Sequence, residues 1–154
     1  MPSWSDFESA APELAASVRR HLDAHTHKTL ATIRADGSPR ISGIETKIAE
    51  GELWIGSMPA ARKARDLQHD PRFALHSGSA DPPGWDGDAK LAGVAEEITD
   101  PERVREINGS VHSSSHLFRL DLREVSTVGL NAERTKLVIR VWTPERDVRT
   151  IERA

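Results

Sequence analysis

The arrangement of apolar residues along the chain predicts three short helices. Leu14, Val18 and Leu22 recur every four residues and give the first helix one apolar stripe. The second segment is rich in alanine and arginine and contains no β-branched residue, which favours a helix over a strand. Thr99 and Glu102 stand three residues apart, as in a capping box, and mark the start of the third helix. The helices are expected at Ser9–His25, Pro59–Gln68 and Thr99–Asn108.

The remaining apolar runs are β-prone and are separated by turn residues. Asp36-Gly37 stands between two such runs and is the strongest short signal for a hairpin. Because strands joined by short hairpins are antiparallel, the pattern predicts a barrel or strongly curled sheet with helices at its ends. The strands are expected at Lys28–Arg34, Pro39–Ala49, Glu52–Ser57, Arg72–Ser77, Ala89–Ile98, Leu117–Leu130 and Lys136–Thr143, with longer loops at Gly78–Asp88 and Gly109–His116.

Composition narrows the class of protein. With 154 residues, 37% of them hydrophobic, the chain suits one globular domain over residues 1–154 of the mainly β (α+β) class. The net charge of −3 argues against a nucleic-acid binder. No run reaches the ~20 apolar residues of a membrane helix, and the first residues do not form a secretory signal. The absence of cysteine excludes thiolate chemistry and fits the reducing cytoplasm.

The most informative segment for chemistry joins the third strand to the second helix. Ser57 ends the strand, and Arg62 and Lys63 stand at the start of the helix. Backbone N–H groups at a helix start attract phosphate, and arginine and lysine side chains add charge-assisted hydrogen bonds. The segment therefore predicts a phosphate site. The alternative is an ordinary surface helix with solvated cations.

This segment resembles the flavin-phosphate segment of the pyridoxamine 5′-phosphate oxidase-like family. The family pattern has a hydroxyl residue, four further residues, an Arg-Lys pair, a helical leucine and an Asn-Pro or Asp-Pro before a strand. The chain matches it with Ser57, Arg62-Lys63, Leu67 and Asp70-Pro71. The hairpin Leu30-Ala-Thr-Ile-x-x-Asp36-Gly37-x-Pro39-Arg40 is also similar to the family's first hairpin, so the likeness covers about Thr29 to Ile98.

The resemblance implies a six-stranded antiparallel split β-barrel with short flanking helices, which forms a homodimer and binds FMN or the deazaflavin coenzyme F-420 between subunits. Carried over by position, Ser57, Arg62 and Lys63 would hold the phosphate. Arg40, Ile41, Ser42, Trp54, Ile55 and Gly56 would lie along the ring system. Ala61 and Asp88 depart from the serine and glutamine common in the family, and the C-terminal substrate signature of the vitamin oxidases is absent.

The function implied is that of an oxidoreductase, dependent on FMN or coenzyme F-420, that acts on a small organic molecule. FMN ranks first because the Ser-x4-Arg-Lys segment is nearest to the FMN-binding pattern. The cofactor carries out the hydride chemistry in such proteins, so no catalytic side chain is assigned. The alternative is a carrier or sensor that holds a flavin or haem on the same barrel without turnover.

Two further side chains are candidates for ligand contact. His76 lies in a strand beside the expected pocket, where it contacts a ring or substrate or is simply a half-buried strand residue. Trp85, on the loop, either covers a ligand, anchors an interface or packs back on its own domain. Trp142 is expected in the core or in a dimer contact.

Two pairs of histidines have the spacing of metal ligands. His21 and His25 are four residues apart, as are His112 and His116. Neither pair forms the H-E-x-x-H motif of zinc sites, so we expect no metal site.

Overall fold

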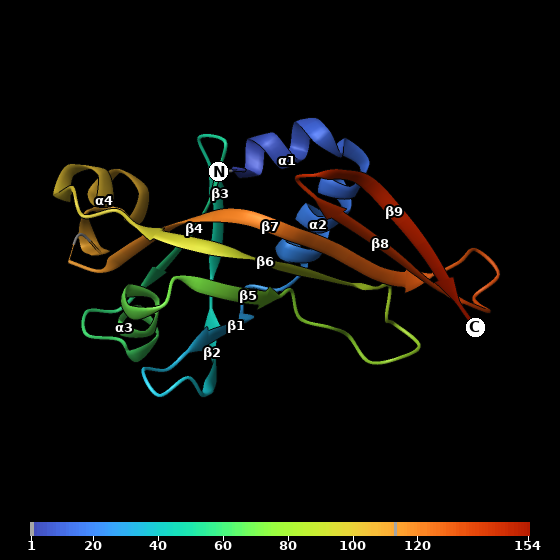
Figure 1. The fold of residues 1–154 in the computed structure, drawn as a ribbon, viewed down its shortest axis with the longest axis horizontal. Coiled ribbons are helices and arrows are strands. Elements are labelled where there is room, and N and C mark those ends of the chain that lie inside the picture. Colours follow the sequence, from blue (N-terminus) through green and yellow to red (C-terminus); the bar gives the residue numbers. More distant parts are fainter. Residues whose placement is uncertain (1, 113) are drawn as a thin grey trace.

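The protein folds as a curled antiparallel sheet with helices at its ends (Figure 1). The computed structural model describes residues 2–112 and 114–154; Met1 and Ser113, which belongs to the predicted loop Gly109–His116, lie outside the described residues. The helices of this part of the chain are α1 (Trp4–Ala10), α2 (Pro12–Ala24), α3 (Arg62–His69), α4 (Pro101–Asn108) and the 3₁₀ turn η1 (Ser110–His112). Its strands are β1 (Lys28–Ile33), β2 (Pro39–Ile44), β3 (Thr46–Ala49), β4 (Glu52–Ser57), β5 (Arg72–His76), β6 (Asp88–Glu97), β7 (His116–Leu130), β8 (Leu137–Thr143) and β9 (Arg146–Arg153).

The strand order confirms the predicted fold class. Seven strands of the described chain follow the order β2-β1-β5-β6-β7-β4-β3, and β8 and β9 extend the sheet from β7. All the pairs are antiparallel. The sheet curls far enough for β2 to contact β4, as in a split barrel. The described residues thus form nine strands, whereas the sequence pattern predicted seven and the family resemblance implied a six-stranded barrel.

The predicted strand Pro39–Ala49 is two strands. β2 pairs with β1, whereas β3 pairs with β4 on the other side of the barrel opening. Glu45 lies between them, because a chain that changes partners in this way must leave the ladder and bend.

The first predicted helix is also divided. α1 begins after Ser3, whose side chain accepts a hydrogen bond from the Asp6 N–H while the Asp6 carboxylate accepts one from the Ser3 N–H. Pro12 has no N–H to continue α1 and instead opens α2. The apolar stripe of α2 is buried as predicted.

The other differences lie at element ends. α3 begins at Arg62 rather than Pro59, since residues 58–61 form a turn in which Ala60 has φ +62°. The cap of α4 is Asp100, not Thr99: its carboxylate accepts a hydrogen bond from the Glu102 N–H. β9 was not predicted because its sequence, RDVRTIER, lacks the alternation of polar and apolar residues that marks a half-buried strand.

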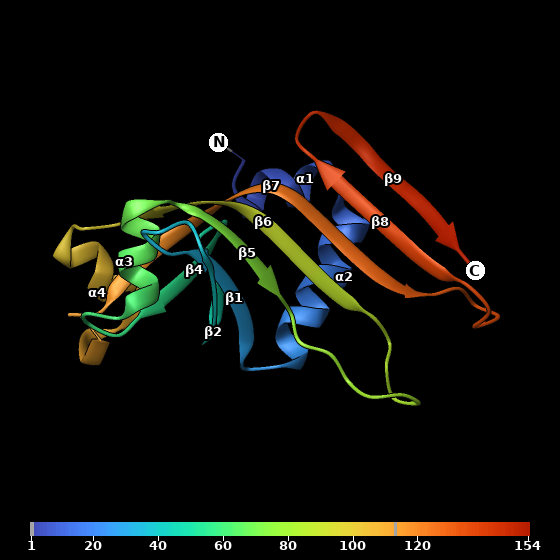
Figure 2. The same cartoon turned by 60° about the horizontal axis from the view of Figure 1, so that its bottom comes forward.

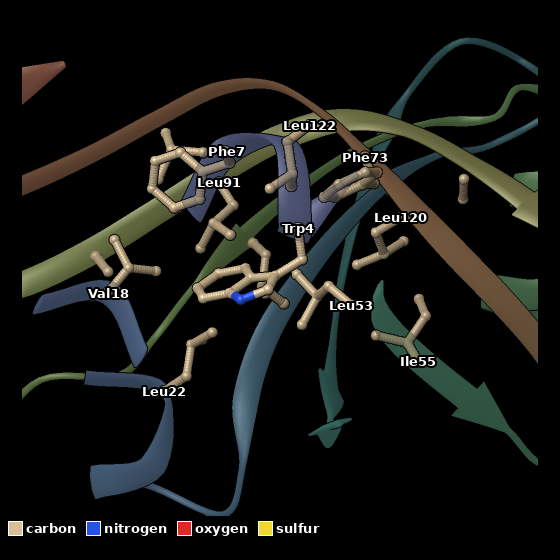
Figure 3. Packing of buried hydrophobic residues seen from close by; sticks show 14 of the residues in the cluster. Trp4, Phe7, Val18, Leu22, Leu53, Ile55, Phe73, Leu91, Leu120 and Leu122 are labelled. Atoms are coloured by element: carbon tan, nitrogen blue, oxygen red, sulfur yellow. The ribbon is translucent and has the colours of Figure 1, made fainter. Parts of the chain in front are cut away.

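The core lies between the concave face of the sheet and the N-terminal helices. Trp4, Phe7, Val18 and Leu22 of α1 and α2 pack against strand residues that include Leu53, Ile55, Phe73, Leu91, Leu120 and Leu122 (Figure 3). Trp142 is buried and packs on Phe7 with ring centroids 4.9 Å apart, so it belongs to the core. In Figure 2, α3 and α4 lie at one end of the barrel and the β8–β9 hairpin lies at the opposite end. Within the described residues, no helix is long and apolar enough to cross a bilayer.

Candidate functional site

A hollow of about 690 Å³ lies where the β2–β3 corner, the end of β4, the first turn of α3 and the α4–η1 segment meet. A volume of this size is within the ~300–1,000 Å³ typical of sites for cofactors and small molecules. Gly56, Ser57 and Lys63, three of the predicted cofactor residues, line it. Gly43 to Lys47 form another wall of the hollow. The fold thus brings Gly43 close to Lys63 of the predicted phosphate segment, which lies 20 residues later in the sequence.

Two of the predicted site serines have buried, unpaired hydroxyls; Ser57 lines the hollow, whereas Ser42 lies outside its lining. Ser57 is the last residue of β4, and Ser42 lies in β2 directly before Gly43. Neither Oγ has a hydrogen-bond partner among the described residues, and both atoms are inaccessible to water. A buried polar group without a partner costs about 1–3 kcal/mol, so such groups call for a partner that the folded chain does not itself supply.

The first turn of α3 provides positive charge and free donors. Ala61 precedes the helix and gives it no side-chain cap, so its first backbone N–H groups have no side-chain acceptor. Lys63 Nζ donates to the Gly43 carbonyl oxygen at 2.5 Å, and burial lowers the pKa of this ammonium group. Within the described chain Lys63 makes no ion pair. Arg62 is exposed and lies outside the hollow's lining.

Gly56 keeps the backbone of β4 open to the hollow. A Cβ at this position would lie 3.2 Å from Asn108 Oδ1 and 3.4 Å from the His116 carbonyl oxygen. Asn108 in turn donates from Nδ2 to that carbonyl at 3.4 Å. A side chain at position 56 would therefore displace the wall that α4 contributes.

Three predicted ring contacts, Arg40, Ile55 and Trp54, have side chains that are bonded to or packed against other parts of the protein. Arg40 Nε donates to Asp66 Oδ2 at 2.7 Å, beneath α3. Ile55 is buried in the hydrophobic core, which leaves only its backbone for a ligand. Trp54, on the face of β4 opposite to Ile55, is almost fully buried but lines the larger hollow, and its Nε1 donates to the Ala49 carbonyl oxygen at 3.0 Å.

Ile41 and His76 line a second, smaller hollow of about 350 Å³ on the outer face of the sheet. Ile41 is 74% exposed, which is unusual for a large apolar side chain. His76 Nδ1 accepts a hydrogen bond from the Gly78 N–H at 3.0 Å, and its Nε2 lies 3.6 Å from Asp88 Oδ2. His76 is thus half-buried and oriented by its own loop, and its contact with a ligand stays a prediction.

The Asp88 carboxylate also binds the side chain of Trp85. Its Nε1 donates to Asp88 Oδ1 at 3.0 Å, and the side chain is half-buried against its own domain. Among the described residues, no three histidine or acidic side chains are grouped as metal ligands would be.

Sequence reasoning missed the wall formed by α4 and η1. Ile107, Asn108, His112 and Ser115 line the larger hollow, and Lys47 Nζ fastens α4 to β3 by donating to the Ile107 carbonyl oxygen at 2.9 Å. No local pattern marks these residues, because they reach the hollow only through the packing of α4 on the sheet.

Comparison with known families agrees with the likeness of the phosphate segment. The family model described as pyridoxamine 5′-phosphate oxidase matches residues 14–129, which is most of the chain. The chain belongs to the pyridoxamine 5′-phosphate oxidase family. The matched region of this family includes β1 to β6, the first turn of α3 and most of β7. None of the curated proteins matches the chain by sequence.

Solved structures in and around the pyridoxamine 5′-phosphate oxidase family share the fold. A pyridoxamine 5′-phosphate oxidase-related, FMN-binding protein of Nostoc punctiforme has a TM-score of 0.64 at 12% identity and covers 94% of this chain and 96% of its own. PhzG of Burkholderia lata, in complex with tetrahydrophenazine-1-carboxylic acid, has a TM-score of 0.64 at 13% identity. The match covers 99% of this chain and 96% of the PhzG chain. HutZ, the haem storage protein of Vibrio cholerae, has a TM-score of 0.54 at 19% identity. The match covers 74% of this chain and 90% of the HutZ chain. At these identities the likeness concerns the fold alone.

Proposed function

We propose that the protein is a flavin-dependent oxidoreductase that binds FMN, or the deazaflavin coenzyme F-420, by its phosphate at the first turn of α3 and acts on a small organic molecule. The observation that carries the proposal is the buried, unpartnered hydroxyl of Ser57 in the lining of a hollow that Lys63, at the uncapped first turn of α3, also lines. A hydroxyl donor, an ammonium group and free N–H groups together suit a phosphate. The absence of cysteine favours action in the cytoplasm.

The residues present fit a phosphate-bearing cofactor. Ser57 would donate its hydroxyl proton to it after a rotation of its side chain toward the hollow, Lys63 would neutralise charge, and Gly56 keeps the adjoining backbone accessible. A bound flavin supplies the hydride chemistry. The chain's contribution is to bind and orient that group, with the α4–η1 wall limiting access of water from one side.

We also propose that the site is completed by a second copy of the chain. The accessible surface of the chain is 8799 Å², whereas a compact monomer of its mass exposes about 7,700 Å². On the outer face of the sheet, Ala31, Ala74 and Ala92 form one cross-strand row beside the exposed Ile41. An outer sheet face with such small side chains suits the close approach of another sheet. The cofactor would then bind in a space formed by residues of both subunits.

Absorbance of the purified protein tests the proposed cofactor. We expect the spectrum of an oxidised flavin or, for coenzyme F-420, of a deazaflavin. A Soret band in its place would identify the haem carrier or sensor and overturn the proposal. Titration of the cofactor-free chain with FMN and with coenzyme F-420 distinguishes the two flavins, and consumption of the reduced cofactor with an acceptor distinguishes an enzyme from a carrier.

Substitution of Ser57 by alanine should change affinity and stability in opposite directions. Loss of one hydroxyl donor to the phosphate should weaken FMN binding about tenfold. The cofactor-free chain should unfold no more easily than the wild type, and by up to about 1 kcal/mol less easily, because an unpartnered buried hydroxyl is removed. Calorimetric titration and urea unfolding measure the two effects. A loss of stability without loss of affinity would contradict the assignment of Ser57.

A further inference from the structure

Asp66 is a buried carboxylate on α3 that joins three elements. Only 6% of the residue is exposed. Its Oδ2 accepts one hydrogen bond from Thr32 Oγ1 of β1 at 2.7 Å and another from Arg40 Nε of β2 at 2.7 Å. Burial would raise the pKa of this carboxyl, but the hydrogen bonds from Arg40 and Thr32 outweigh it and lower the pKa below its usual value. The group is therefore ionised at neutral pH.

Asp66 lies on the same side of α3 as the predicted phosphate cations. Residues three and four positions apart are neighbours on a helix, so Asp66 is close to both Lys63 and Arg62 along the helix surface. Lys63 Nζ also bonds to β2, at the Gly43 carbonyl oxygen. Helix α3 is thus attached to β2 at two points about one turn apart, and these attachments set where its first turn lies relative to the barrel end.

The chemistry of the contact favours a role in geometry. Replacing a buried ion pair by apolar side chains of similar volume is often neutral or stabilising, so burial of Asp66 and Arg40 is not explained by stability alone. Asp66 Oδ2, however, accepts hydrogen bonds from both the Arg40 guanidinium group and the Thr32 hydroxyl. These two directional bonds to one oxygen permit only a narrow range of positions for α3. A merely apolar contact would tolerate sliding of α3 along the sheet.

We infer that Asp66 is a positioning residue for the phosphate site: with Thr32 and Arg40 it holds the first turn of α3, and so Lys63 and Arg62, over the end of β4. This inference rests on the proposed function. It gives Arg40 a role in positioning α3, whereas the sequence predicted that Arg40 contacts the ring system. Arg40 acts through Asp66 on the helix.

The test compares the wild type with Asp66→Asn in two measurements. In the cofactor-free chain, hydrogen exchange of the backbone amides of α3 should become about tenfold faster in the variant, while exchange in β6 and β7 is unchanged. In binding, the dissociation constant for FMN should rise at least about tenfold, while that for riboflavin, which lacks the phosphate, should change less than about twofold. Equal losses for FMN and riboflavin would show a general structural defect and overturn the inference.

Two further variants keep the test decisive if Asp66→Asn does not fold. Thr32→Val removes one of the two hydrogen bonds without changing charge and should lower FMN affinity about threefold, and Thr32→Ser should restore it. Gln68→Ala is the matched control, because it removes a 2.8 Å hydrogen bond between the other end of α3 and Glu97; it should leave the preference for FMN unchanged.

The two measurements separate this inference from the function on which it rests. If the wild type does not prefer FMN to riboflavin, the proposed phosphate site fails, and the exchange rates still decide whether Asp66 positions α3. If the wild type prefers FMN but neither exchange in α3 nor that preference changes in Asp66→Asn and Thr32→Val, the positioning role is wrong.

Discussion

Replacing both Arg62 and Lys63 with alanine should lower the affinity for FMN at least about 100-fold. Each charge-assisted hydrogen bond to a phosphate contributes about 1.5–3 kcal/mol, and 1.4 kcal/mol corresponds to a factor of ten. The affinity for riboflavin should hardly change. The unfolding free energy of the cofactor-free chain should fall by no more than about 1 kcal/mol, since Arg62 is exposed and Lys63 makes one hydrogen bond to Gly43.

Arg65 offers the matched control for this double variant. It is an exposed cation on the same helix that lies outside the larger hollow. Arg65→Ala should bind FMN as the wild type does. The phosphate assignment is wrong if the double variant keeps wild-type affinity for FMN, or if its affinity for riboflavin falls as much as its affinity for FMN. The two side chains are then ordinary surface cations.

The second large effect concerns association of two chains. Lys90 and Glu124 both line the smaller hollow on the outer face of the sheet, and neither side chain makes a hydrogen bond or ion pair within the described part of the chain. We expect Lys90 of one subunit to pair with Glu124 of the other when two chains associate through this face, and two-fold symmetry would then form the pair twice. Lys90→Glu should therefore place like charges together and raise the dissociation constant of the dimer at least about 100-fold.

Light scattering or sedimentation at micromolar concentration measures this effect. We expect a wild-type dimer with an interface at or above ~2,000 Å², a monomer for Lys90→Glu, and recovery of the dimer for Lys90→Glu combined with Glu124→Lys. A monomeric wild type would exclude the shared pocket. A dimeric Lys90→Glu variant that binds FMN normally would place the interface on another face.

Local patterns predicted the parts of the fold that local interactions determine. The Asp36-Gly37 hairpin, the stripe of α2 and the hydroxyl before α3 all appear where they were expected, because turn chemistry and periodicity act over a few residues. The family of the chain followed from the same kind of signal, a short motif with fixed spacing. Strand ends were predicted within one or two residues for β1, β4, β5 and β7.

The missed features depend on contacts between distant residues. Thr32, Arg40 and Asp66 converge from three elements, and no spacing in the sequence announces that Arg40 bonds to a helix residue 26 positions later. The division at Glu45 likewise reflects a change of strand partner, which the β-prone sequence on both sides conceals. The wall of α4 and η1 depends on the docking of a helix onto the sheet.

In the proposed site, the unpartnered hydroxyl of Ser57 would link the lifetime of the protein to the supply of the proposed cofactor. A ligand that binds only the folded chain stabilises it by about 2.7 kcal/mol at a concentration 100 times its dissociation constant. The newly made chain, before the proposed cofactor binds, would carry this buried hydroxyl at a cost and would be the form most exposed to proteases. Cells short of the cofactor should accordingly hold less of this protein, even when its synthesis is unchanged.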